Sequence, residues 1–157
     1  MSVSRNKKVL LGLSGGVDSA VAAALLQEEG FEVIGLTLVF SCRSEEARDK
    51  MINDAKSLAA DLGIEHFIHE ATAEFAEKIM TPFVNAWRRG ETPNPCVLCN
   101  PLMKFPSMLK LADEHGCDFI ATGHYAGIGD QEGRIIPLQA RRRDQQVTLL
   151  RGSDSKK

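Results

Sequence analysis

The sequence predicts an α/β fold with a doubly wound, mainly parallel sheet. Short apolar runs alternate along the chain with longer segments whose apolar residues repeat at helical spacing. Connections of helical length favour right-handed crossovers between parallel strands. A glycine-rich turn joins the first apolar run to the first helix, at the strand end where ligands bind in folds of this Rossmann-like kind.

Size and composition are those of one globular domain. The chain has 157 residues, of which 43% are hydrophobic, enough to bury a single core. No apolar run approaches the roughly 20 residues that a membrane span requires, and residues 1–8 are too short and polar for a signal peptide. We therefore expect a cytoplasmic protein without a membrane partner, in which the four cysteines are mostly reduced.

The charge of the chain gives no general argument for nucleic-acid binding. The formal net charge is −2, whereas nucleic-acid binders usually carry a basic domain or a basic face. Any contact with a polyanion must therefore use a short basic patch. The candidate patches are Arg88-Arg89, Arg141-Arg142-Arg143 and Lys156-Lys157.

The first half of the chain is predicted to form three strands and two helices. Residues 8–13 are an apolar run typical of a strand covered on both faces. The first helix begins near Val17 and ends near Gly30, and residues 31–40 form the second strand. Ser44 is the expected N-cap of a long helix that ends at Gly63, before a third strand at residues 64–68. The apolar stripe of this helix should pack in the core; it consists of Met51, Ile52, Ala55, Leu58, Ala59 and Leu62.

A helix with an internal proline is predicted next. Thr72 is its expected cap, and Pro82 should kink it or mark a break. Its apolar residues lie four apart along the sequence: Phe75, Ile79, Phe83 and Trp87.

Two prolines then exclude regular helix from residues 91–99. Pro93 and Pro95 each restrict the backbone of the residue before them. Asn100 is the expected N-cap of the next helix, with Pro101 at its first position. This segment should therefore be a shaped loop that leads into a helix.

The last clear element is a fourth strand at residues 119–122, which runs into Gly123, His124 and Tyr125. From Gly127 the pattern weakens, and a final β-like piece follows at residues 146–150. His124 lies at a strand end, where it could contact a ligand or orient the loop through a hydrogen bond.

The glycine-rich turn at residues 13–19 (Leu-Ser-Gly-Gly-Val-Asp-Ser) is the strongest functional signal. Gly15 and Gly16 allow backbone N–H groups to approach an anion, and the first turn of the following helix adds unpaired N–H groups. Ser14 and Ser19 add hydroxyl donors, and Asp18 offers a carboxylate for a metal ion or a loop contact. The turn lacks the Gly-Lys-Ser/Thr ending of a Walker A loop, so a different nucleotide chemistry is indicated.

The cysteines of residues 92–100 (Thr-Pro-Asn-Pro-Cys-Val-Leu-Cys-Asn) are the second signal. Cys99 lies just before the predicted helix start, where the helix dipole should lower its pKa below the value of about 8.5 for free cysteine. Cys-x-x-Cys is also half of a zinc site, but no second pair follows, and Cys117 with His115 has poor spacing for the rest. Cys42 and Cys117 are more simply small buried side chains.

These motifs carry a family resemblance. The turn Ser-Gly-Gly-Val-Asp-Ser resembles the pyrophosphate loop of the ATP pyrophosphatases, whose fold is adenine nucleotide alpha hydrolase-like. Over nearly the whole chain the sequence resembles the tRNA-specific 2-thiouridylases, which replace O2 of the wobble uridine of certain tRNAs with sulfur. The matching segments are residues 12–19, 92–100, 104–105, 121–125 and 150–157.

The resemblance implies roles for particular residues. Those that would bind the ATP phosphates are Gly12, Leu13, Ser14, Gly15, Gly16, Val17, Asp18 and Ser19. Leu38 would lie against the adenine, and Gly123 would contact the nucleotide. The residues that would contact tRNA are Asn94, Pro95 and Cys96, beside the target base, and Lys157, at the start of a Lys-Asp-Gln contact that this chain does not complete. Cys99 matches the nucleophile, and Cys96 stands where many members carry aspartate.

The implied reaction begins with adenylation of the uridine O2. Pyrophosphate leaves, sulfur from a sulfur-donor protein attacks the activated carbon, and Mg²⁺ offsets the phosphate charge. In a persulfide scheme a second cysteine further along the chain carries the sulfur and Cys99 assists its release. In an iron–sulfur scheme these cysteines are cluster ligands instead, and the sequence leaves both schemes open. No residue is assigned to a resident metal, and the oligomeric state is undetermined.

The chain ends at Lys157, where members of this family continue. We therefore expect residues 1–157 to be an ATP-pyrophosphatase domain truncated near its C-terminal end, without the central and β-barrel domains and incomplete for catalysis. One alternative is a stand-alone ATP pyrophosphatase that acts on a small molecule. Another is a non-catalytic nucleotide-binding module, which would not need residues 92–100.

Overall fold

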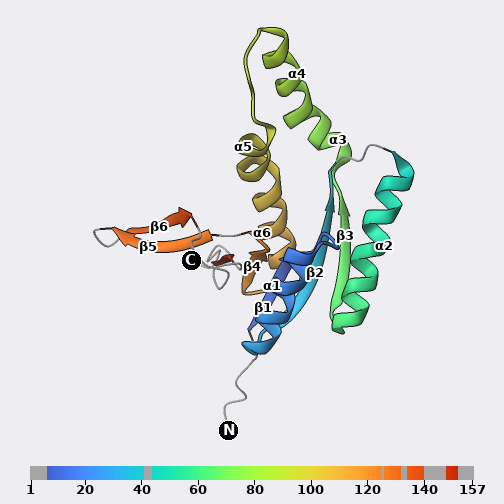
Figure 1. Cartoon of the computed structure of the whole chain (residues 1–157), viewed down its shortest axis with the longest axis vertical. Coiled ribbons are helices and arrows are strands. Elements are labelled where there is room, and N and C mark those ends of the chain that lie inside the picture. The colour runs from blue at the N-terminus through green and yellow to red at the C-terminus, as the bar shows by residue number, and fades with distance from the viewer. Residues whose placement is uncertain (1–6, 41–43, 125, 132–133, 140–147, 152–157) are drawn as a thin grey trace.

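A five-stranded sheet in the order β3-β2-β1-β4-β7 is the centre of the fold (Figure 1). The computed structural model describes residues 7–40, 44–124, 126–131, 134–139 and 148–151. The strands of this sheet are β1 (Lys8–Gly12), β2 (Glu32–Val39), β3 (Glu65–Glu70), β4 (Phe119–Thr122) and β7 (Thr148–Arg151). β1 to β4 are mutually parallel and β7 is antiparallel to β4, which confirms the predicted doubly wound α/β fold.

The helices and a separate hairpin complete the chain. α1 (Val17–Glu28) follows β1, and α2 (Glu45–Leu62) follows β2. β5 (Ala126–Gln131) and β6 (Arg134–Gln139) pair in an antiparallel two-stranded sheet, within the region where the sequence pattern weakens. The remaining helices are α3 (Thr72–Phe75), the π-helical turn η1 (Ala76–Met80), α4 (Thr81–Arg88), α5 (Pro95–Cys99), the π-helical turn η2 (Asn100–Lys104) and α6 (Phe105–Glu114).

Strand β1 is buried on both faces, as its apolar sequence predicts. Val9 and Leu11 lie in a cluster with residues of α1 and α2, whereas Leu10 lies in a second cluster with Met108 and Ala112 of α6. All three β1 side chains are fully buried. Alternate side chains of a strand point to opposite faces, so β1 joins two helical layers into one core.

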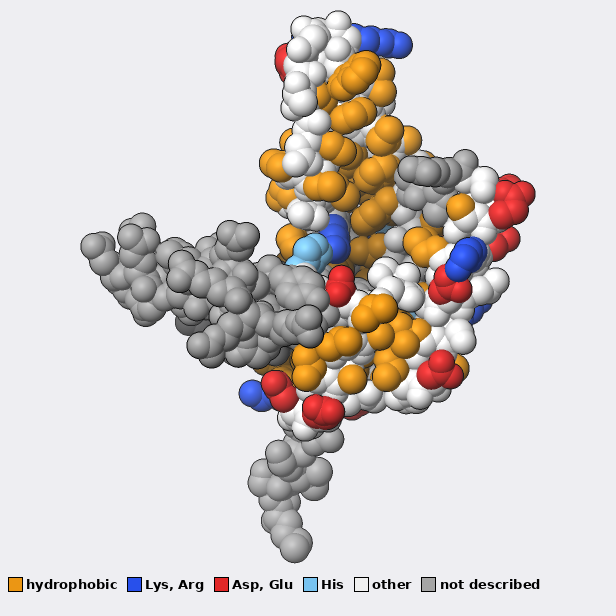
Figure 2. Space-filling model, in the orientation of Figure 1, with side chains coloured by type: hydrophobic (Ala, Val, Ile, Leu, Met, Phe, Trp, Pro, Cys, Tyr) orange, Lys and Arg blue, Asp and Glu red, His pale blue; other side chains and the backbone are white. Residues whose placement is uncertain are grey.

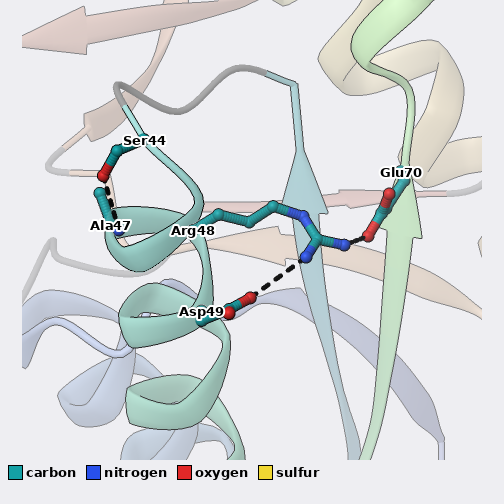
Figure 3. A network of polar contacts seen from close by, with 5 residues as sticks. All are labelled: Ser44, Ala47, Arg48, Asp49 and Glu70. Carbon is teal, nitrogen blue, oxygen red and sulfur yellow. Dashed lines mark hydrogen bonds and ion pairs between the residues drawn. The ribbon is translucent and has the colours of Figure 1, made fainter.

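Helix α2 begins and ends as the sequence predicts. The Ser44 side chain accepts a hydrogen bond from the Ala47 N–H at 3.2 Å, and Gly63 closes the helix in the left-handed conformation with φ of 65°. Figure 3 shows this cap beside the Arg48 guanidinium, which forms ion pairs with Asp49 and with Glu70 of β3. These contacts attach the first turn of α2 to the end of β3.

The helix around Pro82 begins one residue earlier than predicted, and its irregular turn lies before the proline. The residue before its first turn is Ala71, without a side-chain cap, and Thr72 lies inside the helix. Helical structure continues through Pro82, and the irregularity is the π-helical turn η1 just before it, closed by a bond from the Thr81 N–H to the Ala76 carbonyl. A proline lacks the N–H that regular helix requires, and a widened turn accommodates this loss.

The start of the next helix was predicted wrongly. The helix begins at Pro95, and the Asn94 side chain caps it by accepting a bond from the Cys96 N–H at 3.0 Å. Asn94-Pro95, six residues earlier, offers the same cap-then-proline pattern as Asn100-Pro101, and this earlier pair starts the helix. Only residues 91–94 of the predicted loop are non-helical.

Candidate functional site

The glycine loop, residues 13–19, is tied together by its two serines. The Ser19 hydroxyl donates to the Gly16 carbonyl at 2.9 Å and accepts from the Ser14 N–H at 3.3 Å. The Ser14 and Ser19 hydroxyl oxygens lie 3.4 Å apart. Gly16 precedes α1 without a side-chain cap, so the N–H groups of the first helical turn remain available to an anion.

Two glycines are required by close approaches at this loop. Gly15 has φ of 77°, and a Cβ there would lie 2.9 Å from the Asp54 Cβ of α2. A Cβ on Gly123, at the end of β4, would lie 2.8 Å from the carbonyl carbon and oxygen of Asp18. The absence of side chains therefore lets α2 and the end of β4 pack directly against the loop and the start of α1.

A buried polar chain fixes the first residue of the loop. The Thr37 hydroxyl, within β2, donates to the Leu13 carbonyl at 2.7 Å, and its oxygen lies 2.8 Å from the His66 Nε2. Because the Thr37 proton is used, His66 must donate through Nε2. Burial, together with the charge of Lys56, lowers the pKa of His66 and favours this neutral form. Sequence reasoning missed this pair, although a threonine and a histidine in apolar strands were a usable signal.

His124 follows β4 and is oriented by a hydrogen bond. Its Nδ1 lies 2.8 Å from the Thr122 hydroxyl. Burial and then the positive charge of Lys104 lower the pKa of His124. The loop-orienting role considered from the sequence therefore fits the geometry, and the side chain also lines the pocket described below.

The two cysteines of α5 have different surroundings. Cys96 is exposed in the first turn, whereas Cys99 is partly buried at the end of the helix. Burial raises the pKa of Cys99, the neighbouring Cys96 raises it further, and the charge and N–H of Lys104 act in the opposite direction. The predicted lowering of the Cys99 pKa is therefore wrong, because the helix begins before Cys96 and not at Cys99.

One pocket of about 420 Å³ brings the separate motifs together. The predicted site residues that line it are Gly12, Leu13, Ser14, Asp18, Ser19, Leu38, Cys99 and Gly123. The other lining residues were not assigned to the site from the sequence: Leu36, Thr37, Phe40, Lys104, Thr122, Met51, which was expected in the core, and His124, for which a ligand contact was left open. The size and the mixture of apolar walls with a few polar groups are typical of a small-molecule site.

Other predicted site residues lie outside the lining. Gly15, Gly16 and Val17 belong to the glycine loop and the start of α1, and Val17 is 77% exposed. Asn94, Pro95 and Cys96 form the start of the helix whose far end, Cys99, reaches the pocket. Lys157 lies outside the described residues, as do the predicted basic patches at residues 141–143 and 156–157.

An apolar surface extends beside the pocket. Figure 2 shows hydrophobic side chains gathered over α4 and α5, which rise beyond the sheet in Figure 1. The exposed large hydrophobic residues of η1, α4, α5 and η2 are Met80, Val84, Trp87, Val97, Leu98 and Leu102. Exposed apolar patches mark interaction sites, so this surface is a candidate contact region.

No resident metal site is found in the part of the chain that the structure describes. No three His, Cys, Asp or Glu side chains there lie close enough together to hold a metal ion. Cys117 is buried, and burial raises its pKa to about 11, which fits the simple core role. Within the same described ranges, no helix has the length and apolarity of a membrane span.

The fold and the pocket together define the class of the domain as an adenine nucleotide alpha hydrolase-like, Rossmann-like α/β domain of the nucleotide-binding kind. More particularly, the chain belongs to the family described as the tRNA methyl transferase HUP domain, whose model matches residues 7–157.

Curated relatives and a solved structure agree with this assignment. The chain is 43% identical over 130 residues to a tRNA-specific 2-thiouridylase of Bacteroides fragilis, an alignment that covers 82% of this chain and 34% of the relative. It is 47% identical over 121 residues to a tRNA-specific 2-thiouridylase of Nitratiruptor, covering 77% of this chain and 35% of the relative. The chain therefore spans about a third of the length of these relatives.

The structural likeness extends to a tRNA thiolase. The U34-tRNA thiolase NcsA of Methanococcus maripaludis, a structure with its [4Fe-4S] cluster, superposes with a TM-score of 0.53 and 30% sequence identity. The match covers 79% of this chain and 40% of that one.

Proposed function

We propose that this chain is the nucleotide-binding and adenylating part of an ATP-dependent tRNA-uridine 2-sulfurtransferase. The observation that carries the proposal is that the glycine loop and Cys99 line the same pocket. The loop supplies donors for phosphate, and Cys99 supplies a thiol at the same cavity. The names of the 2-thiouridylase relatives and of the tRNA thiolase support uridine in tRNA as the target.

ATP, the first substrate, would lie in the pocket with its adenine on the apolar side and its phosphates at the glycine loop. Leu38, Phe40 and Met51 offer an apolar wall for the adenine, with Leu38 as the predicted contact. The triphosphate then lies against the glycine loop, where Ser14, Ser19 and the N–H groups of α1 are placed. Mg²⁺ bound with ATP would neutralise phosphate charge, and Asp18 is the carboxylate that lines the pocket.

The reaction then proceeds by successive displacements. The uridine O2 bonds to the α-phosphorus while the bond to the β-phosphate oxygen breaks, and pyrophosphate leaves. In the persulfide scheme, the outer sulfur of a persulfide on the second cysteine next attacks C2, and AMP leaves with the former O2. The Cys99 thiolate then attacks the inner sulfur of the persulfide, so the S–S bond to the transferred sulfur breaks, that sulfur stays on C2, and a disulfide joins Cys99 to the second cysteine. Cys99 is the thiol at the cavity wall, and Asn94, Pro95 and Cys96 lie at the outer end of the same helix, where the target base would enter. Lys157 is proposed as a further tRNA contact.

The sulfur reaches C2 by one of the two schemes left open by the sequence, with a sulfur-donor protein as partner. A cluster bound by cysteines takes four thiolates in its common form. The described residues bring two thiols to α5, Cys96 and Cys99, so they do not complete such a site by themselves.

The test is a thiolation assay with the full-length protein. Cys99→Ser should abolish 2-thiouridine formation in tRNA, while the matched variant Cys117→Ser should retain it, because Cys117 is a core residue away from the pocket. Normal 2-thiouridine formation after Cys99→Ser would contradict the proposed role. ATP labelled at its α-phosphate provides a second reading, because adenylation releases AMP and not ADP. Release of AMP by this chain without any tRNA would favour the small-molecule pyrophosphatase instead.

A further inference from the structure

The pocket contains one strongly basic side chain. Among the described residues that line it, Lys104 is the only lysine or arginine. The glycine loop itself carries no lysine, in contrast to a Walker A loop. Asp18 adds a negative charge to the lining, and the pKa of His124 is lowered. A triphosphate entering this pocket therefore meets one cationic side chain, and it comes from a helix far from the loop in sequence.

The π-helical turn η2 directs Lys104 toward the pocket. In a regular α-helix, residues five positions apart, such as Cys99 and Lys104, point about 140° away from each other. η2 spans residues 100–104 and is closed by a bond from the Phe105 N–H to the Asn100 carbonyl, which widens the turn. Both Cys99 and Lys104 consequently line the same cavity.

The surroundings of Lys104 suit an incoming anion. The side chain is partly buried, and burial lowers its pKa, while the thiols of Cys99 and Cys96 act in the opposite direction. Among the described residues, no ion pair joins Lys104 to a carboxylate. A partly desolvated ammonium group without a carboxylate ion-pair partner among the described residues gains strongly from a charge-assisted bond to phosphate.

We propose that Lys104 binds the α-phosphate of ATP, and so supplies from the cysteine-bearing helix the cation that the glycine loop lacks. The choice of the α-phosphate rests on the proposed function. Sulfur must attack the carbon whose oxygen is bonded to the α-phosphorus, so Cys99 has to lie near that phosphate, and Lys104 shares its wall of the pocket. Lys104 would then stabilise the charge of the adenylate and of the AMP that leaves.

Calorimetric binding of adenosine, AMP and ATP to this chain tests the proposal. Lys104→Gln and Lys104→Met remove the charge, and Lys104→Arg keeps it. Lys110→Gln is the matched control, because Lys110 lies on α6 in an exposed pair with Glu114. We expect the neutral variants to bind AMP and ATP about ten- to a hundredfold more weakly, with unchanged adenosine affinity. Lys104→Arg should keep most of the affinity and Lys110→Gln all of it.

The contrary outcomes distinguish failure of the proposed function from failure of the Lys104 contact. If the unmodified chain binds neither ATP nor AMP, the proposed function fails. If it binds both and the neutral variants bind AMP equally well, Lys104 is not the phosphate contact and the proposed function stands. Loss of ATP affinity with AMP affinity intact would contradict the α-phosphate assignment. Failure of both neutral variants to fold would assign Lys104 a structural role and overturn the inference.

Discussion

The glycine loop and the cysteine-bearing helix, α5 with η2, line the same pocket but owe their geometry to different causes. The loop is fixed at short range, by serine hydrogen bonds, by the left-handed Gly15 and by the close approach of Gly123 to Asp18. The helix is placed by its cap at Asn94 and by the π-helical turn, with Cys96 left exposed. The loop is therefore anchored to the core at its two buried ends, Leu13 and Ser19, whereas the helix leaves Cys96 exposed and Cys99 partly buried.

The largest effect on unfolding free energy is expected at Gly15, and comparison with a second glycine separates backbone strain from the packing of α2 against the loop. Gly15→Ala should lower the free energy of unfolding by about 3 kcal/mol, because it adds a left-handed alanine and a clash with Asp54. Gly30→Ala is the matched control, since Gly30 has φ of 84° and a Cβ there would meet nothing within 4 Å. It should cost about 1 kcal/mol.

Urea denaturation of both variants measures the difference. Equal losses for Gly15→Ala and Gly30→Ala would show that α2 does not pack against the loop as described. The loop would then owe its shape to its own hydrogen bonds and not to the core.

A smaller effect is expected from the polar chain behind the loop. Thr37→Val removes the donor to the Leu13 carbonyl and the acceptor for His66, at a cost of about 2 kcal/mol in unfolding free energy. Thr81→Val is a suitable control, because the Thr81 hydroxyl bonds the Ala76 carbonyl at an exposed position. If both variants lose the same free energy of unfolding in urea or thermal denaturation, the two Thr37 hydrogen bonds stabilise the fold no more than an exposed hydroxyl bond does.

The expected effect at the cysteine-bearing helix is a shift in thiol reactivity. The pKa of Cys99 is raised, so at neutral pH less of it is thiolate than in a free cysteine, and its alkylation rate should keep rising at pH values where a free thiol has levelled off. Cys96→Ser removes one of the causes of the raised pKa and should move the profile of Cys99 toward lower pH. Iodoacetamide kinetics read by mass spectrometry give both profiles. A Cys99 thiol that is fully reactive in mild acid would contradict this environment.

The same contrast explains what the sequence could and could not predict. β1, α1 and the capped helix α2 follow from local rules: an apolar run, a glycine-rich turn, and Ser44 with Gly63 at the two ends. The convergence of the glycine loop and Gly123 follows from parallel strands, whose carboxyl ends meet at one edge. These parts of the fold are determined by residues close together in the sequence and by the parallel order of the strands.

The wrong predictions for the helix start and for the pKa of Cys99 arose where two proline-containing segments offer the same helix-start signal. Asn94-Pro95 and Asn100-Pro101 are equivalent local signals, and only the packed helix distinguishes them. Because the helix begins at Pro95, Cys99 lies at the end of α5 and not at a helix start, and its pKa is raised and not lowered. The sequence did not predict Lys104 in the pocket, because regular helical spacing gives no signal of a π-helical turn such as η2.

The most direct test of the central claim is protection of Cys99 by ATP. The structure places Cys99 in the pocket with the glycine loop and leaves Cys96 exposed outside it. Alkylation of this chain should therefore slow at Cys99 when ATP is added, with an ATP dependence that matches the binding affinity, while the rate at Cys96 stays nearly unchanged. An unaltered rate at Cys99 with ATP bound would contradict the shared pocket, and so would equal protection of both thiols.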